Sequence, residues 1–334
     1  MLLAVATWAC AASQSGSGED SVTLALGAYT TPREAYRKIL PAFAADLKAR
    51  TGRSVGFEES YLGSAAQARA IVGGFEADLA ALSLEPDLET LMKEQLIAHD
   101  WKARALGGMV TQSLVVIAVR PGNPKNIRGW DDLRRPGMQV VAPNPRTSGG
   151  AMWNVAAIYG AALRGLTSAP AGDSAAAERL LRDIMRNVVI MDKGARESII
   201  TFEGGVGDAA ITYENEVLVA QTAGKPMQFV IPRGTIRIDN PIAVVDTYAR
   251  KRGTLAVAEA FVQFLMTPAA QRIFAETGLR PVEPTVAAEF RAKYPDVADL
   301  FTIDGLGGWP VVTRNLFGPG GVFERASARV TAQQ

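Results

Sequence analysis

The chain has 334 residues, of which 48% are hydrophobic and 21% are charged, and its formal net charge is +1. This length allows one large or two ordinary domains with well-buried cores, and the composition is that of a soluble globular protein. A net charge close to zero does not fit a nucleic-acid-binding protein, which usually carries a basic stripe. Any anion site must therefore depend on local groups rather than on the overall field of the protein.

The first twenty residues form an apolar run followed by a small, polar stretch, which predicts an export signal and a flexible leader over residues 1–20. The apolar run is too short to span a bilayer, and no later segment is long and apolar enough to do so. Cys10 is the single cysteine, so an internal disulfide is not possible. Its position resembles a bacterial lipoprotein cleavage site, where the cysteine takes a lipid. The alternative is a fortuitous cysteine within a plain export signal.

Short apolar strands then alternate with helical patterns along the chain. Up to residue 119 we expect a strand at residues 22–26, a helix at 32–50, a strand at 54–58, a helix at 65–72, and strands at 77–82 and 113–119. From there to residue 202 we expect a helical turn at 130–133, a strand at 138–142, a helix at 150–164, a surface loop at 167–174, a strand at 188–191 and a helix at 195–202. The remaining elements are a strand at 209–212, a helix at 214–223, strands at 226–231 and 242–245, and helices at 254–266 and 268–277.

This alternation predicts an α/β architecture with largely parallel strands. The number of strands suggests two sheets rather than one, with the chain crossing between them near residues 116–120 and 232–240. We therefore expect a discontinuous first lobe, residues 21–117 plus 237–334, and a second lobe of residues 118–236.

Five strand-to-helix turns are rich in hydrogen-bond donors and small residues. They lie at residues 27–34, 60–67, 144–150, 192–196 and 212–216. In open α/β sheets, ligands bind beyond the carboxyl ends of the strands, where helix N-termini direct free N–H groups outward. The same residues could simply cap helices: Thr31 with Glu34, and Ser64 with Gln67, both match the spacing of a capping box.

The third turn, Asn144-Pro-Arg-Thr-Ser-Gly-Gly150, holds more than a cap requires. It offers two hydroxyl groups and two consecutive glycine amides, and glycine allows the backbone to come close to a ligand. None of the five turns matches a phosphate-cradling P-loop or a dinucleotide-binding fingerprint.

At these turns the chain resembles the bacterial sulfate- and thiosulfate-binding protein family. The most specific part is Asn144-Pro-Arg-Thr-Ser-Gly-Gly-Ala-Met-Trp-Asn154, which is similar to the family signature Asn-Pro-Lys-x-Ser-Gly-Gly-Ala-Arg-Trp-Asn. Shorter similarities follow in the family's order at residues 119–125, 192–196, 207–208, 214–216, 301–304 and 307–309. The resemblance extends from about residue 22 to residue 323.

The resemblance implies a type II periplasmic-binding-protein fold of two lobes, each a mainly parallel sheet flanked by helices, hinged by crossover strands and closing on a dehydrated sulfate. It implies a ligand set of Thr30 (through its backbone), Ser64, Ser148, Gly149, Gly150, Ala195 and Tyr213. It also implies no catalysis, no cofactor and no metal. The expected protein is a monomer, periplasmic or lipid-anchored through Cys10, that delivers its anion to the permease of an ABC importer.

Three residues depart from the family pattern. Thr30 stands where the family has aspartate, Met152 where it has arginine, and Tyr213 where it has tryptophan. A tyrosine hydroxyl can accept a hydrogen bond as well as donate one. This bears on the choice of ligand because sulfate carries no proton, whereas monohydrogen phosphate needs an acceptor. A carboxylate directed at the ligand would favour phosphate; we expect Glu59, Asp192 and Glu214 to face outward or to cap neighbouring turns.

Other functions stay open as alternatives. The ligand could be thiosulfate, phosphate, molybdate or tungstate. An enzyme on the same two-lobed architecture, such as hydroxymethylbilane synthase, carries its cofactor on a cysteine, and this chain has none after the leader. His99 has no partner spacing typical of a metal site or catalytic base, so we expect an ordinary surface or packing role. A further alternative is the sensor lobe of a regulator, and such a protein would also need a DNA-binding segment. The tryptophans, including Trp130, Trp153 and Trp309, are expected in the core.

Overall fold

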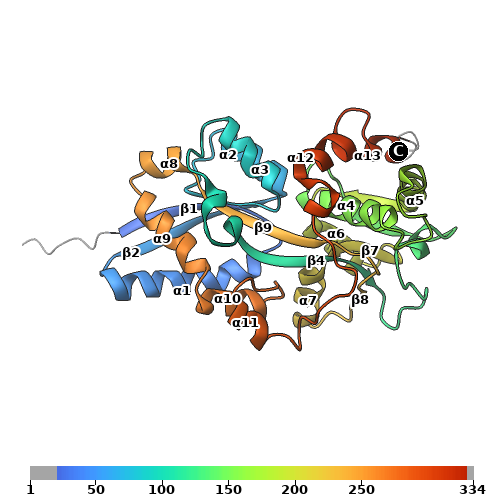
Figure 1. The fold of residues 1–334 in the computed structure, drawn as a ribbon. Coiled ribbons are helices and arrows are strands. Elements are labelled where there is room, and N and C mark those ends of the chain that lie inside the picture. The colour runs from blue at the N-terminus through green and yellow to red at the C-terminus, as the bar shows by residue number, and fades with distance from the viewer. Residues whose placement is uncertain (1–20, 329–334) are drawn as a thin grey trace, which may run out of the picture.

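The computed structural model describes residues 21–328, so the predicted leader and Cys10 lie outside the described residues. It confirms the α/β alternation (Figure 1). The strands are β1 (Ser21–Tyr29), β2 (Ser54–Leu62), β3 (Leu79–Ala81), β4 (Met109–Val119), β5 (Val140–Pro143), β6 (Val188–Asp192), β7 (Ala209–Tyr213), β8 (Gln228–Val230) and β9 (Arg237–Val244). The helices are α1 (Arg33–Thr51), α2 (Ser64–Val72), α3 (Glu85–Lys93), α4 (Gly149–Leu163), α5 (Ser174–Arg186), α6 (Ala195–Glu203), α7 (Glu214–Thr222), α8 (Asp246–Lys251), α9 (Leu255–Leu265), α10 (Pro268–Glu276), α11 (Pro284–Glu289), α12 (Gly308–Val312) and α13 (Val322–Ser327).

The strands form one continuous sheet in the order β2-β1-β3-β9-β4-β7-β5-β6, with β8 also paired to β4. The expectation of two separate sheets is therefore wrong. The reason is the length of β4, whose first part pairs with β9 and whose last five residues pair with β7. Pairing is parallel among β1, β2 and β3 and among β5, β6 and β7, whereas β4 and β9 run antiparallel to their neighbours. The sheet is thus mixed, and β4 and β9 connect two halves of the molecule (Figure 1).

Each half has its own hydrophobic core, because helices cover the faces of its parallel strands. In the first half, Phe43 of α1 and Phe261 of α9 pack edge to face at 5.1 Å, among buried side chains of β1 and β3. In the second half, helices α4 and α5 pack with buried residues of β5 and β7. All three tryptophans expected in the core are there, at most 3% exposed.

The C-terminal segment packs on the second half, although the expected boundary placed residues 237–334 in the first lobe. Phe301, Val312 and Val322 belong to the same core as α4 and α5. The ring of Trp309 lies edge-on to that of Trp153, with centroids 4.7 Å apart. Apolar burial explains this placement, since these side chains share one core with α4 and α5. Helices α12 and α13 lie beside α4 and α5 (Figure 1).

Several helices were not anticipated from the sequence, namely α3, α5, α8, α11, α12 and α13. Helix α5 is the longest of them, and its signal was present. Asp173 accepts a hydrogen bond from the Ala176 N–H at 2.8 Å, and the helix buries one apolar stripe that includes Leu180, Leu181 and Ile184.

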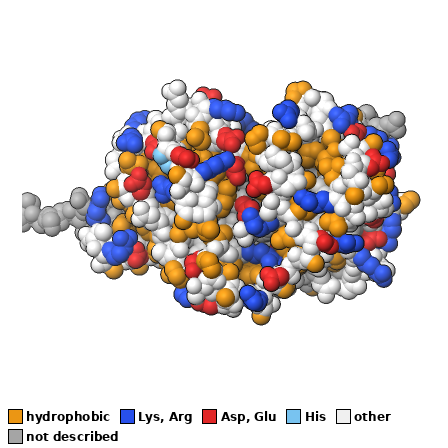
Figure 2. Space-filling model, in the orientation of Figure 1, with side chains coloured by type: hydrophobic (Ala, Val, Ile, Leu, Met, Phe, Trp, Pro, Cys, Tyr) orange, Lys and Arg blue, Asp and Glu red, His pale blue; other side chains and the backbone are white. Residues whose placement is uncertain are grey.

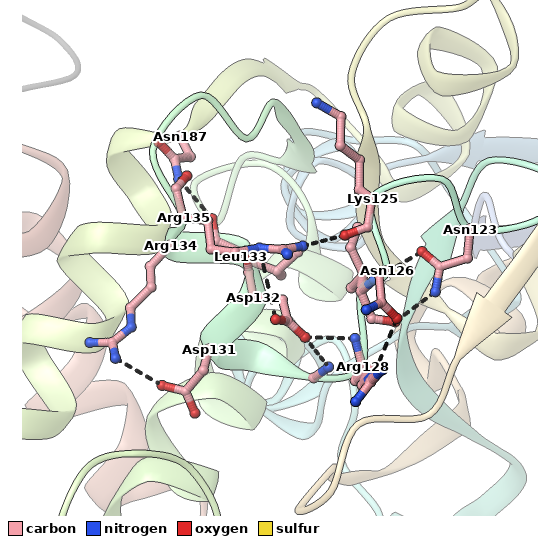
Figure 3. Close-up of polar contacts among 12 residues, drawn as sticks. Asn123, Lys125, Asn126, Arg128, Asp131, Asp132, Leu133, Arg134, Arg135 and Asn187 are labelled. Atoms are coloured by element: carbon pink, nitrogen blue, oxygen red, sulfur yellow. Dashed lines mark hydrogen bonds and ion pairs between the residues drawn. The ribbon is translucent and has the colours of Figure 1, made fainter.

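The loop between β4 and β5 is held by its own side chains and by Asn187, which lies between α5 and β6 (Figure 3). Asn123 donates to the Ile127 carbonyl at 2.8 Å and accepts from the Ile127 N–H at 2.9 Å. Asp132 accepts from the N–H groups of Arg128 and Gly129, and Asn187 donates to the carbonyls of Leu133 and Arg135. Side-chain hydrogen bonds of this kind satisfy backbone groups of the loop that lie outside the sheet.

Acidic and basic side chains are interspersed over the face drawn in Figure 2, in keeping with the small net charge. Within residues 21–328, the length and hydropathy that a bilayer-spanning helix requires are not found in any helix.

Candidate functional site

The starts of α2, α4 and α6 supply the first group of candidate donors. Ser64 and Ala195 are the first residues of α2 and α6, and Gly149 and Gly150 are the first two residues of α4. The opening N–H groups of a helix have no carbonyl partner within it and carry partial positive charge. Ser148 caps α4 through the Ala151 N–H at 3.4 Å, as its position predicted.

The two predicted capping boxes are wrong. Helix α1 begins at Arg33 after Pro32, without a side-chain cap, because Glu34 pairs with Arg196 instead. Helix α2 has Gly63 at its N-cap position, and Gln67 accepts a hydrogen bond from the Ser60 hydroxyl at 3.0 Å. A distant partner thus replaces the predicted cap at α1, and a partner within the same turn replaces it at α2.

Gly149 and Gly150 are surrounded so closely that a side chain at either position would displace neighbouring atoms. A Cβ on Gly149 would lie 2.7 Å from Ser83 Oγ, and one on Gly150 would lie 2.6 Å from Tyr213 Cε2. The same Gly150 Cβ would lie 3.2 Å from Ala195 Cβ and 3.4 Å from Ser148 Oγ. The glycines therefore bring the start of α4 against Ala195 and the Tyr213 ring.

Ser83, which the sequence did not single out, joins these groups. Its N–H donates to Ser64 Oγ at 2.8 Å, and its hydroxyl lies 2.6 Å from the Tyr213 hydroxyl. Its carbonyl accepts from Trp153 Nε1 at 3.1 Å and from Asn240 Nδ2 at 3.2 Å. Ser83 follows β3 and precedes α3, so it lies on a further strand-to-helix turn. The turn was missed because α3 was missed.

The Ser64 hydroxyl is fully engaged within the protein. It donates to the Asp87 carboxylate and accepts from the Ser83 N–H. The Ser64 backbone N–H, at the start of α2, is therefore the group that can face a ligand. Burial raises the pKa of Asp87 to about 6, against opposing effects of the Ser64 hydrogen bond and of Arg69.

Tyr213 is 1% exposed and lies at the end of β7, directly before α7. Burial raises the pKa of its hydroxyl, although hydrogen bonds with Ser83 and Asn240 act in the opposite direction. The phenol is therefore neutral and can act as a hydrogen-bond donor. Its ring centroid lies 6.5 Å from that of Tyr29, the residue directly before Thr30.

Thr30 lies in the turn between β1 and α1, where its carbonyl accepts from the Arg33 N–H at 3.3 Å. The structure thus brings six of the seven predicted residues together through direct contacts or through Ser83. Thr30 is at the edge of this group, next to Tyr29. Of the side chains in the group, Ser64, Ser148 and Tyr213 are at most 3% exposed, so an ion held here would be out of water.

The two halves touch around this cluster. A Cβ on Gly63 would lie 2.4 Å from the Thr147 carbonyl oxygen, so the N-cap of α2 meets the loop before α4. Arg196, the second residue of α6, pairs with Glu34 of α1 at 2.7 Å and with the buried Glu216 of α7 at 2.6 Å. Burial raises the pKa of Glu216, and Arg196 opposes this shift.

The carboxylates of Glu59, Asp192 and Glu214 each contact another side chain of the protein. Glu59 is exposed and accepts from the Tyr61 hydroxyl at 2.6 Å. Asp192 accepts from the Thr201 hydroxyl at 3.0 Å. Glu214 does not face outward: it is buried and pairs with Arg280 at 2.7 and 2.9 Å.

His99 has a structural partner. Its Nδ1 lies 2.7 Å from Asp246 Oδ2, which also accepts from the Ala98 N–H at 2.7 Å. This local role matches the sequence expectation. Over residues 21–328, the structure contains no group of three or more histidine, cysteine, aspartate or glutamate side chains placed to hold a metal ion.

Residues 24–280 match the family of bacterial extracellular solute-binding proteins. The sulfate-binding protein of Synechococcus elongatus is 42% identical over 96% of this chain and 91% of its own length. The thiosulfate-binding protein of Pseudomonas aeruginosa is 33% identical over 89% of this chain and 90% of its own. The solved structure of the sulfate-binding protein SubI from Mycobacterium tuberculosis is 40% identical, with a TM-score of 0.81 over 90% of this chain and all of that one.

Proposed function

Because the chain belongs to the sulfate- and thiosulfate-binding family of bacterial solute-binding proteins, we propose that it captures sulfate for an ABC importer. Its fold is the mixed α/β periplasmic-binding-protein fold. Membership of this family makes it a binding protein rather than an enzyme. Identity to the sulfate-binding relative is 42%, against 33% for the thiosulfate-binding one, which favours sulfate.

The observation that carries this proposal is the buried, charge-neutral cluster of donors around the start of α4. The anion would receive N–H groups from Thr30, Ser64, Gly149, Gly150 and Ala195, and O–H groups from Ser148 and Tyr213. Burying a dianion is very costly unless its oxygens meet donors on all sides. Several helix N-termini together supply those donors and partial positive charge.

The nearby arginine supports recognition by dipoles rather than by a bonded cation. Arg196 is committed to Glu34 and Glu216, which it contacts through different nitrogen atoms. Arg146 is exposed, and Met152 takes the place of the family's arginine. The local field at the anion would therefore come mainly from oriented amides and hydroxyls.

We propose further that the two halves are lobes hinged at β4 and β9, and that they close on the anion. Donors come from both lobes: Thr30 and Ser64 from the first, and the remaining predicted residues from the second. The contacts of Gly63 with Thr147 and of Ser83 with Tyr213 would belong to the closed state. On this assignment, residues 300–328 move with the second lobe.

In the cell, the protein would act as a monomer outside the cytoplasmic membrane, free in the periplasm or held by a lipid on Cys10, and would deliver sulfate to a permease. The signal over residues 1–20 supports export.

Calorimetric titration of the purified protein tests the proposal. Sulfate, thiosulfate, phosphate, molybdate and tungstate would each be titrated into protein freed of anions by dialysis. We expect one site per chain and the tightest binding for sulfate. Tighter binding of any of the other four anions, or no binding of sulfate, would contradict the assignment.

A further inference from the structure

The hydroxyl groups of Ser83 and Tyr213 form a hydrogen-bonded pair at the start of α4, with the Asn240 amide beside both residues. Their oxygens are 2.6 Å apart, and either oxygen can be the donor. Both residues are 1% exposed. The pair lies against the two glycines that open α4, because Ser83 Oγ is the nearest neighbour of a Cβ on Gly149, and the Tyr213 ring is the nearest neighbour of one on Gly150.

Tyr213 differs from the other predicted ligand groups because its hydroxyl is hydrogen-bonded to a second hydroxyl, that of Ser83. Five of those groups are backbone N–H groups, which can only donate. The Ser148 oxygen already accepts from the Ala151 N–H, so its proton is the group left for a ligand. The polarity of the Tyr213 hydroxyl can be reversed, because its partner Ser83 can either donate to it or accept from it.

Two protons are shared between these two oxygens. In one arrangement Ser83 donates to Tyr213, and Tyr213 donates its own proton to the anion. In the other, Tyr213 donates to Ser83, the Ser83 proton turns away from Tyr213, and a lone pair of the Tyr213 oxygen faces the anion. The first arrangement suits a fully ionised oxyanion, because it offers a proton to the anion. The second arrangement suits an oxyanion that carries one proton, because it offers a lone pair to that proton.

We propose that Ser83 and Tyr213 act as one reversible hydroxyl pair that lets this site take singly protonated oxyanions, such as monohydrogen phosphate, as well as fully ionised ones. Ser83 is the positioning residue, and Tyr213 is the group that contacts the anion. This inference rests on the proposed function, since it places the anion at the start of α4.

The Ser83→Ala variant separates the two arrangements. The three backbone hydrogen bonds of Ser83 remain, so its effect on the fold is small. With sulfate, Tyr213 loses one neutral hydrogen bond that it accepted. With monohydrogen phosphate, the Tyr213 proton loses its acceptor and stays buried without a partner, which is the more costly change.

Sulfate and phosphate would be titrated calorimetrically into the wild type and the variants, at a pH where phosphate is a monohydrogen dianion. We expect Ser83→Ala to weaken sulfate binding about threefold and phosphate binding a further tenfold or so. Tyr213→Phe should weaken both anions, and the double variant should match Tyr213→Phe within roughly twofold, because the pair acts as a unit. Ser113→Ala, which truncates another buried serine outside the pair, should change neither affinity.

Equal effects of Ser83→Ala on the two anions, or no effect on either, would overturn the hydroxyl pair, as would a wild-type protein that binds sulfate but no phosphate. If Ser83→Ala does not fold, Ser83→Cys offers a second test, because its thiol remains a weak hydrogen-bond partner for Tyr213. This variant should shift the ratio of sulfate affinity to phosphate affinity in the same direction by a smaller factor. A wild type that binds phosphate but not sulfate would overturn the proposed function and leave the pair standing.

Discussion

The Ser148 side chain shows how one residue can serve both the fold and the ligand. Its oxygen caps α4 by accepting from the Ala151 N–H, which leaves its proton as a donor at the same helix end. Asp and Asn are equally good N-caps, so either can replace serine without weakening the helix. The charge at this position can therefore be changed separately from the stability of α4.

Ser148→Asp should lower sulfate affinity by a hundredfold or more, because a carboxylate placed against a dianion costs several kcal/mol. Ser148→Asn keeps the cap of α4 and adds no charge, so it is the matched control. Its loss of sulfate affinity should be much smaller. Calorimetric titration would measure both affinities, and thermal melting would confirm that both variants fold. Wild-type affinity in the aspartate variant would mean that Ser148 does not contact the anion.

Asp87 is the second residue whose chemistry can be tested alone. Burial raises its pKa from 3.8 to about 6, so the folded protein holds this proton more tightly than the unfolded chain does. Stability contributed by the protonated form is therefore present at low pH and is lost as the pH rises through this range.

Asp87→Asn keeps a hydrogen-bond partner for Ser64 but cannot ionise. Its free energy of unfolding should exceed that of the wild type by up to about 3 kcal/mol near pH 8 and should equal it near pH 4. Denaturant unfolding without sulfate at the two pH values would measure this. A difference that does not depend on pH would show that Asp87 does not titrate in this range.

At the scale of elements, the approach of α2 to α4 depends on Gly63. The backbone of Gly63 has φ −58° and ψ 143°, which any residue can adopt, so glycine is needed here for space alone. The Thr147 and Lys193 carbonyl oxygens would lie 2.4 and 3.2 Å from a Cβ at this position.

Gly63→Ala should keep the lobes from closing fully and lower sulfate affinity about tenfold or more, in line with the cost of an overpacked contact. Gly56→Ala on β2 is the control, because its Cβ would lie at an ordinary 3.7 Å from Thr23 Oγ1. Equal affinities for the two variants would exclude this contact from the bound state.

At the scale of the whole molecule, the buried pair of Arg280 and Glu214 links the segment after α10 to the start of α7. Their side chains are 13% and 2% exposed, and two hydrogen bonds of 2.7 and 2.9 Å join them. Removing one partner of such a pair leaves a buried charge without compensation, whereas removing both is far less costly.

Arg280→Met should lower the free energy of unfolding by about 3 kcal/mol, and Arg280→Met with Glu214→Gln should recover most of this loss. Denaturant unfolding of the two variants and the wild type would measure the effect. If the double variant is no more stable than Arg280→Met, the pair is not the source of the loss.

The sequence by itself determined the α/β alternation and the position of most of the strands and of the helices that follow them. Hydrophobic periodicity and the runs of donors at strand-to-helix turns are local signals, and they held at β1, α1, β4 and α4. The same signals pointed to Ser148, Gly149 and Gly150, because their spacing sets both the cap of α4 and the glycine contacts. The amphipathic stripe of α5 is likewise a local signal.

Tertiary structure alone decided which partners these residues meet. Glu34 had capping spacing, but Arg196, 162 positions away, pairs with its side chain. The hydrogen bond of Ser83 with Tyr213 joins residues 130 positions apart. The union of the strands in one sheet, the docking of α12 and α13 on the second half, and the burial of Asp87 beside Ser64 likewise depend on distant segments. Such contacts form only when the whole chain packs, so local periodicity and spacing carry no signal for them.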